Sequence, residues 1–205
     1  MASIASEIAR VVLRVSSVSD PTVLDVGAGA GTFTVPAFGL IREAVPRAAF
    51  YATDVAPAML RELSRRDRGI ATFVGIAEDL SESVKIARRY TDLPGRFDVL
   101  VSTLMLHHCE DVTDVLESIN QVLSPGGALV LADLRKHDFA DFREEMGDVH
   151  LGFDVDELRE LAEETFCHAS LVNLPEQCRC EDTGRTVDLF MLVAEKTRYS
   201  GPRAA

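Results

Sequence analysis

The sequence is poor in cysteine and contains no long apolar stretch. Only four of its 205 residues are cysteine, which is too few for a disulfide-based secreted scaffold, so we expect reduced thiols and a cytoplasmic protein. No segment approaches the roughly 18 consecutive apolar residues that a membrane-spanning helix needs. Residues 1–17 lack the basic start and continuous apolar block of a signal peptide, and their pattern predicts an amphipathic helix instead.

Basic residues are also scarce. The chain has 21 Lys and Arg residues against 33 Asp and Glu residues, which gives a formal net charge of -12. Nucleic-acid phosphates and anionic lipid surfaces would be repelled by such a protein at long range. We therefore expect neither a nucleic-acid partner nor a membrane partner.

What the sequence does contain is an alternation of apolar strand-like and amphipathic helix-like segments. With 47% hydrophobic residues, residues 1–205 suit one compact domain. Strands are expected at 22–26, 48–54, 69–77, 97–106, 127–134, 167–174 and 186–196, and helices at 3–17, 32–45, 56–66, 79–91, 110–123, 137–147 and 154–166. This alternation predicts an α/β fold with a doubly wound parallel sheet and an antiparallel pair at the end.

The stretch VLDVGAGAGTFT, residues 23–34, places Gly27, Gly29 and Gly31 directly after the first strand. In doubly wound sheets ligands bind beyond the carboxyl ends of the strands, and glycine lets the backbone approach a ligand closely. The dinucleotide pattern G-x-G-x-x-G requires Gly or Ala where Thr32 stands. Asp25 would repel a pyrophosphate but suits a cationic ligand. The motif therefore favours S-adenosylmethionine, which carries a sulfonium and an ammonium group.

LDVGAGAGTFT also resembles the first motif of class I S-adenosylmethionine-dependent methyltransferases. YATDVAPAML, GIAEDL, FDVLVSTLMLHHCED and VLSPGGALVLADL resemble later motifs of that family in the same order. The similarity is greatest to the small-molecule group around the ubiquinone/menaquinone C-methyltransferases. It implies a Rossmann-like seven-stranded sheet of order 3-2-1-4-5-7-6, with the last strand antiparallel and helices on both faces. Residues 1–20 would be an N-terminal helix, and 136–153 an insertion near the acceptor site.

The resemblance implies roles for individual residues. The backbone of Gly27, Ala28, Gly29 and Gly31 would lie against the methionyl part of the cofactor, with Asp25 on its ammonium side. Independently of the family, an ionised carboxylate at Asp54 offers two acceptor oxygens that suit a ribose diol.

Further motif residues are assigned to the other parts of the cofactor. Val55, Met59, Ala77 and Glu78 would surround the adenine, and Ser102 and Leu104 would border the transferring methyl group. Relatives usually carry an acidic residue where Ile76 stands, so the adenine amino group would be held by Glu78, Asp79 or a backbone carbonyl.

His107 and His108 follow the fourth strand and are the candidate catalytic residues. A histidine can act as general base near neutral pH. The alternative is a structural hydrogen bond, because positioning alone can supply much of the acceleration of methyl transfer. Adjacent residues seldom converge on one ion, so no metal site is expected.

These observations predict methyl transfer from S-adenosylmethionine to an O, N, S or C nucleophile of a small molecule, with S-adenosylhomocysteine as product. A homodimer or a partner chain could complete the acceptor site. Two alternatives stay open: a regulatory or scaffold protein that binds the cofactor without turnover, and a nicotinamide enzyme, against which Thr32 speaks.

Overall fold

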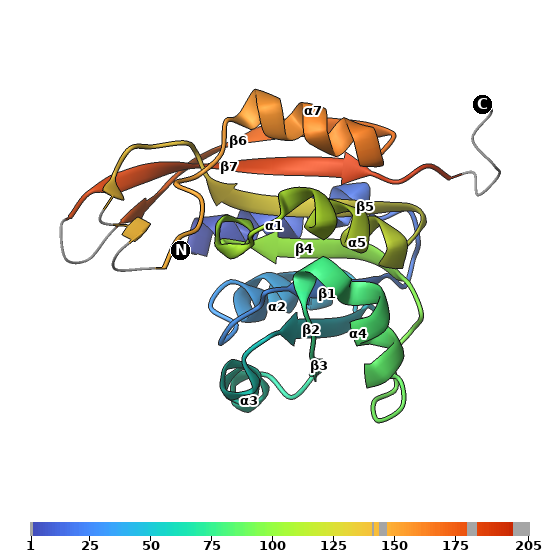
Figure 1. Cartoon of the computed structure of the whole chain (residues 1–205). Helices are drawn as coiled ribbons and strands as arrows, with labels where there is room; N and C mark the ends of the chain where they lie inside the picture. Colours follow the sequence, from blue (N-terminus) through green and yellow to red (C-terminus); the bar gives the residue numbers. More distant parts are fainter. Residues whose placement is uncertain (1, 141, 144–146, 180–183, 199–205) are drawn as a thin grey trace.

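A computed structural model describes residues 2–140, 142–143, 147–179 and 184–198 of the chain. Its centre is one seven-stranded sheet of order β3-β2-β1-β4-β5-β7-β6 (Figure 1). The strands are β1 (Thr22–Val26), β2 (Ala49–Asp54), β3 (Ile70–Val74), β4 (Phe97–Thr103), β5 (Leu123–Leu134), β6 (His168–Arg179) and β7 (Thr186–Glu195). The first five strands pair in parallel, and β7 runs antiparallel to both β5 and β6. The predicted strand order and direction are confirmed.

Helices cover both faces of the sheet. They are α1 (Ala2–Val15), α2 (Thr34–Ala44), α3 (Pro57–Arg66), α4 (Leu80–Ala87), α5 (Val112–Val122) and α7 (Val155–Thr165). Buried side chains of α1, α2 and α3, such as Val11, Phe38 and Leu63, form one core with the sheet. Those of α4, α5 and α7 form a second core on the opposite face. The β-strands are therefore apolar on both sides, as expected for a parallel sheet between two helical layers.

The fourth and fifth strands differ from their predicted bounds. β4 ends at Thr103 rather than residue 106, because Leu104 has a left-handed backbone with φ 54°. A short 3-10 helix, η2 (Leu106–His108), follows it. β5 begins at Leu123 rather than at residue 127, so the SPGG segment (124–127), which we expected to connect a helix to this strand, belongs to the strand. A register shift opposite this segment, between Phe97 and Val99, accommodates it.

The sixth strand also extends beyond its expected end at residue 174. β6 continues to Arg179, with a register shift between Asn173 and Gln177 where it passes Pro175. Proline donates no hydrogen bond to a strand ladder, which accounts for an irregularity there. The helix expected at 137–147 includes residues 141 and 144–146, which lie outside the described residues.

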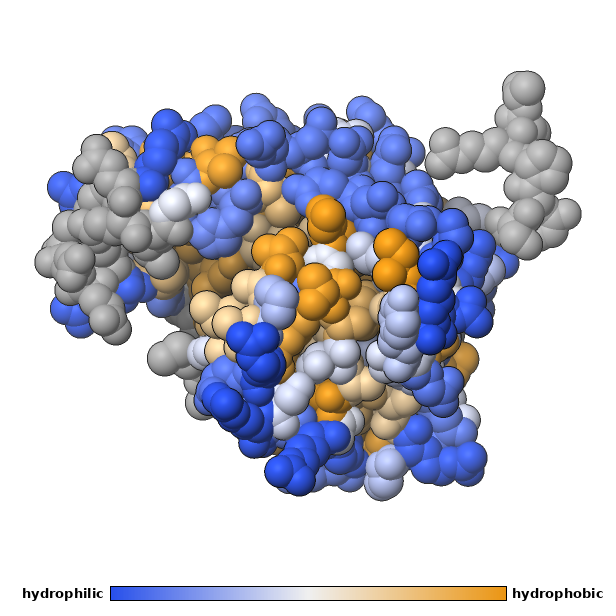
Figure 2. Space-filling view, turned by 60° about the horizontal axis from the view of Figure 1, so that its bottom comes forward, coloured by the Kyte–Doolittle hydropathy of each residue, from blue (hydrophilic) through white to orange (hydrophobic). Residues whose placement is uncertain are grey.

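The described surface combines polar regions with an uncovered apolar one. Hydrophobic residues gather near the centre of the face in Figure 2 and hydrophilic residues surround them. Among the described helices, none is both long and apolar enough to cross a membrane.

Candidate active site

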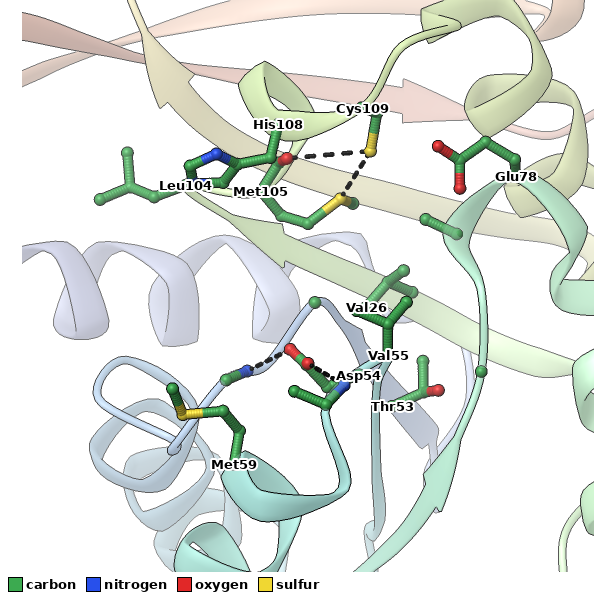
Figure 3. A pocket seen from close by; sticks show the side chains of 15 residues that line it. Val26, Thr53, Asp54, Val55, Met59, Glu78, Leu104, Met105, His108 and Cys109 are labelled. Atoms are coloured by element: carbon green, nitrogen blue, oxygen red, sulfur yellow. Dashed lines mark hydrogen bonds between the residues drawn. The ribbon is translucent and has the colours of Figure 1, made fainter. Parts of the chain in front are cut away.

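A cavity of about 530 Å³ opens beyond the carboxyl ends of β1, β2 and β4. Such a volume lies within the range of small-molecule sites, roughly 300–1,000 Å³. Nine of the predicted site residues line it: Gly27, Gly29, Asp54, Val55, Met59, Ala77, Glu78, Leu104 and His108. In Figure 3 Asp54, Val55 and Met59 lie on one side and Leu104, Met105 and His108 on the other.

The glycine-rich loop turns back over the end of β2. The N–H groups of Gly27 and Ala28 donate to the carbonyl of Thr53 at 2.9 and 3.1 Å. A side chain at Gly27 would collide with Met105, since an added Cβ would lie 2.1 Å from Met105 Cγ. Gly29 differs, because an added Cβ would meet no atom within 4 Å. Its bare backbone therefore faces open space in the cavity.

Gly31 lies in the same loop but has a packing role. It does not line the cavity, and its φ of +80° is one that side chains rarely adopt. An added Cβ would lie 2.9 Å from Leu63 Cγ and 3.0 Å from Val35 Cγ2. Ala28 likewise packs against the core instead of lining the cavity.

Asp54 ends β2 and holds the loop in place. Its Oδ2 accepts a hydrogen bond from the Gly29 N–H and its Oδ1 one from the Ala56 N–H, both at 2.8 Å (Figure 3). A carboxylate has about four acceptor positions. Two positions thus remain for a ligand that carries a pair of hydroxyl groups.

Asp25 lies beneath the loop and is not part of the cavity lining. It is 2% exposed, and Thr34 Oγ1 donates to its Oδ2 at 2.6 Å. Burial raises the pKa of Asp25 to about 7; the hydrogen bond from Thr34 opposes this effect and the charge of Asp54 adds to it. Near neutral pH this carboxyl group can therefore be either charged or neutral.

The structure distinguishes between the residues that were expected to lie near the adenine. Glu78 lines the cavity, whereas Asp79 caps α4 by accepting from the Glu82 N–H at 3.3 Å. Ile76 is 53% exposed and is not part of the lining. Of the acidic residues in this segment, only Glu78 is therefore placed to meet a ligand in the cavity.

At the end of β4, Leu104 and Ser102 differ in their access to the cavity. Leu104 lines the cavity in a left-handed conformation, and its N–H donates to the carbonyl of Ala132 at 2.9 Å. Non-glycine residues adopt this conformation at a cost of about 1–2 kcal/mol, so the surrounding structure must enforce it. Ser102 is 1% exposed and lies outside the lining.

The two histidines have different environments. His107 is buried, with Nδ1 2.6 Å from Asp133 Oδ1 and Nε2 3.6 Å from Asp148 Oδ1. Burial alone would lower the pKa of His107, but the hydrogen bond and charge of Asp133 and the charge of Asp148 raise it overall. His108 lines the cavity with an exposed side chain. Only His108 is thus placed to contact a ligand.

Sequence reasoning missed several cavity residues and both carboxylates around His107. The missed lining residues are Val26, Thr53, Ala56, Gly75, Met105 and Cys109. Burial raises the pKa of Cys109 to about 12, with the charge and hydrogen bond of Glu78 adding to it, so little thiolate is present near neutral pH. Asp133 sits at the carboxyl end of β5, a position that could have drawn attention. Asp148 gives no comparable sequence signal.

The mixed sheet of this strand order, with a glycine loop after β1 and an acidic residue at the end of β2, is the fold of class I S-adenosylmethionine-dependent methyltransferases. A family model described as "Methyltransferase domain" matches residues 24–129. The chain belongs to this methyltransferase domain family.

Similarity to individual proteins is distant. Malonyl-acyl-carrier-protein O-methyltransferase of Halorhodospira halophila is 34% identical over 110 residues, which cover 54% of this chain and 34% of that protein. The YcgJ protein of Bacillus subtilis has a similar fold, with a TM-score of 0.67 at 15% identity over 94% of this chain and 99% of that one. Phosphoethanolamine N-methyltransferase 2 of Haemonchus contortus, solved with S-adenosylmethionine, gives 0.64 at 14% identity over 93% of this chain and 52% of that one. The chain spans 3–45% of the length of the curated relatives it matches.

Proposed function

We propose that the protein transfers a methyl group from S-adenosylmethionine to a small-molecule acceptor and releases S-adenosylhomocysteine. The observation that carries this proposal is the composition of the cavity. Its described lining contains the carboxylates of Asp54 and Glu78 and no Lys or Arg. A phosphate-bearing ligand would be repelled there, whereas a cationic nucleoside would be attracted.

The cofactor would be held along the cavity by groups of matching chemistry. The methionyl part would lie over the bare backbone at Gly29, and the ribose hydroxyls would donate to the free acceptor positions of Asp54. Val55 and Met59 offer apolar surface for the adenine, and Glu78 can accept from its amino group. Asp25 would act from below the loop, through its charge and the hydrogen bond with Thr34, rather than by direct contact.

The methyl group would be transferred at the end of the cavity bordered by Leu104 and His108. The reaction is an in-line displacement: the acceptor atom bonds to the methyl carbon as the carbon–sulfur bond breaks, and its electrons return to sulfur. Holding the two reactants in line supplies much of the acceleration. His108 is placed to remove the acceptor's proton where the acceptor carries one, while His107 is buried and would position η2.

We also propose that the acceptor is a small molecule, because of the size and charge of the site. The cavity of about 530 Å³ has the size of a small-molecule site. A second subunit or a partner chain could complete the acceptor side. Mass measurement of the protein in solution, alone and with cofactor, would test whether it acts as a monomer.

The decisive experiment measures binding first and turnover second. We expect one equivalent of S-adenosylmethionine to bind in isothermal titration calorimetry, and a labelled methyl group to appear in a metabolite-extract product detected by mass spectrometry. Absence of cofactor binding, or preferential NADH binding, would refute the proposal. Binding without product across a broad acceptor panel would support the regulatory or scaffold alternative.

Two variants of one residue test the loop assignment. Gly29→Ala and Gly29→Val both place a side chain at φ +54°, where β-branched valine costs more backbone energy than alanine, and only the valine side chain fills much of the space that the cofactor needs. We expect the valine variant to lose binding and the alanine variant to retain part of it, with unchanged far-UV circular dichroism. Equal affinity of Gly29→Val and the parent protein would contradict the assignment.

A further inference from the structure

Two histidines and one carboxylate converge beside the cavity. One donor atom from each of His107, His108 and Asp148 lies within 4.8 Å of the other two. Asp148 Oδ1 is 3.6 Å from His107 Nε2 and 3.9 Å from His108 Nδ1. His107 and His108 belong to η2, and Asp148 comes from the segment before α7. The fold thus adds a third donor, from a distant segment, to the two adjacent histidines.

Asp133 determines which nitrogen of His107 faces Asp148. Asp133 accepts from the N–H of Leu106 at 2.9 Å and of Leu134 at 2.7 Å, so both of its oxygens act as hydrogen-bond acceptors. Its Oδ1 also lies 2.6 Å from His107 Nδ1, which must therefore carry the proton. This leaves Nε2 as the nitrogen that can offer a lone pair. A carboxylate that orients a histidine in this way is the usual second partner of a metal-binding histidine.

Asp148 is buried beside two imidazole rings and accepts a hydrogen bond from neither of them. The residue is 2% exposed, and neither of its carboxylate oxygens accepts a hydrogen bond from any residue that the structure describes. The 3.6 Å separation from His107 Nε2 is too long for a hydrogen bond. Buried carboxylates are normally paired by hydrogen bonds or coordinate a metal, so this arrangement favours the binding of a cation.

The distances suit a metal ion between these groups. With bonds of about 2.0–2.1 Å to zinc, two donors 3.6 Å apart subtend roughly 120° at the ion. His108 Nδ1 is more distant and lies 3.5 Å from the Gly147 carbonyl, to which it can only donate, so it would have to leave this contact and lose its proton to bind the ion. The side chain is 44% exposed and can turn toward Asp148. Two imidazoles and one carboxylate favour zinc or a similar transition metal over magnesium, which prefers oxygen ligands and keeps its water.

We propose that His107 Nε2, His108 Nδ1 and the Asp148 carboxylate bind one divalent transition-metal ion of the zinc type. Binding of the ion is independent of the methyl-transfer proposal. Its role rests on that proposal: because His108 also lines the cavity, the ion would lie at the rim. There an open coordination position could hold a hydroxyl or thiol of the acceptor in its deprotonated form. In that case the ion would replace His108 as the group that promotes loss of the acceptor's proton, because an imidazole bound through Nδ1 has no free lone pair.

The test uses the full chain after chelator treatment and desalting, at pH 7.5. Zinc is titrated in competition with a chromophoric chelator, and cobalt(II) is added separately to record its visible absorption. We expect one equivalent of zinc, a cobalt spectrum typical of nitrogen and oxygen ligands that zinc abolishes, and no competition from millimolar magnesium. Asp148→Asn and His108→Ala should each weaken zinc binding about 100-fold, and Asp133→Asn about 10–100-fold through loss of positioning.

His168→Gln is the matched control, because His168 is an exposed histidine on β6 far along the chain from the cluster. It should leave zinc affinity unchanged. Absence of stoichiometric zinc binding, or undiminished binding in both Asp148→Asn and His108→Ala, would overturn the inference. If Asp148→Asn fails to fold by circular dichroism, His108→Ala decides, since its ring is exposed.

Cofactor binding and methyl transfer are measured on the same preparations. Zinc binding without S-adenosylmethionine binding would leave the metal site standing and refute the proposed function. Cofactor binding and turnover without zinc binding would support the proposed function and refute the metal site. The cluster would then be explained by a His107 imidazolium between two carboxylates.

Discussion

The substitution Asp25→Asn tests whether the buried carboxyl group beneath the glycine loop has a raised pKa. Asparagine has nearly the same shape, and its side-chain oxygen can still accept the hydrogen bond from Thr34, which is 2.6 Å long in the parent protein. Unlike aspartate, it cannot ionise. The variant therefore removes the titration of one buried group and leaves its packing in place.

The magnitude follows from the pKa of Asp25. Folding raises it from an ordinary 3.8 to about 7, chiefly through burial. Because the folded state holds this proton more tightly, the stabilising contribution is full below pH 4 and is lost as the pH rises to 7. At about 1.36 kcal/mol per pH unit, the loss is at most roughly 4 kcal/mol. The variant has no such loss, so its stability relative to the parent should increase by about 2–4 kcal/mol from pH 4 to pH 8.

The assay is urea unfolding without ligand at intervals between pH 4 and pH 8. Unfolding is followed by far-UV circular dichroism, because the chain has no tryptophan for fluorescence. Any fixed cost of the new amide group is the same at every pH and does not affect the trend. A difference between Asp25→Asn and the parent that stays constant within about 0.5 kcal/mol across this range would refute the reasoning.

Three further results are expected. Asp54→Ala should weaken S-adenosylmethionine binding by about 1–3 kcal/mol in calorimetry, because a charged hydrogen-bond acceptor is lost; an unchanged dissociation constant would exclude the ribose role. Gly31→Ala should destabilise the fold by about 1–3 kcal/mol in urea unfolding, since its Cβ would lie 2.9 Å from a core side chain. Its control is Gly39→Ala, within α2 and with open space around it, which should stabilise the fold by about 0.5–1 kcal/mol. Cys109, with its pKa raised to about 12, should react with iodoacetamide at pH 8 far more slowly than exposed Cys167, as peptide mass spectrometry would show; equal rates would contradict its burial.

Most of the sheet could be predicted from the sequence because its signals are local. An apolar run such as residues 97–103, bounded by polar segments, is too short for a typical helix and therefore predicts an inner strand that is buried on both faces. The errors occurred where a conformation depends on distant contacts. Leu104 ends β4 by adopting a left-handed backbone beside β5, and SPGG joins β5 instead of connecting a helix to it. Neither feature has a local sequence signature.

The candidate site likewise combines features that the sequence predicts with features that required the structure. Gly29, Asp54 and Glu78 were predictable because strand ends in a parallel sheet meet at one edge, so residues that follow strands are brought together. The sequence could not distinguish the role of Glu78 from the roles of its neighbours in the same segment. The capping of α4 by Asp79 and the exposure of Ile76 required the structure.

By itself, then, the amino-acid order determined the alternation of strands and helices, their arrangement in a doubly wound sheet, and the bare acidic crevice at its edge. Only the tertiary structure decided that His107 is buried while its neighbour His108 faces the cavity, and that Asp148 reaches both. The physical reason is distance along the chain: hydrophobic periodicity acts over a few residues, whereas the burial and charge of a side chain depend on segments that folding brings from 26 and 41 residues away.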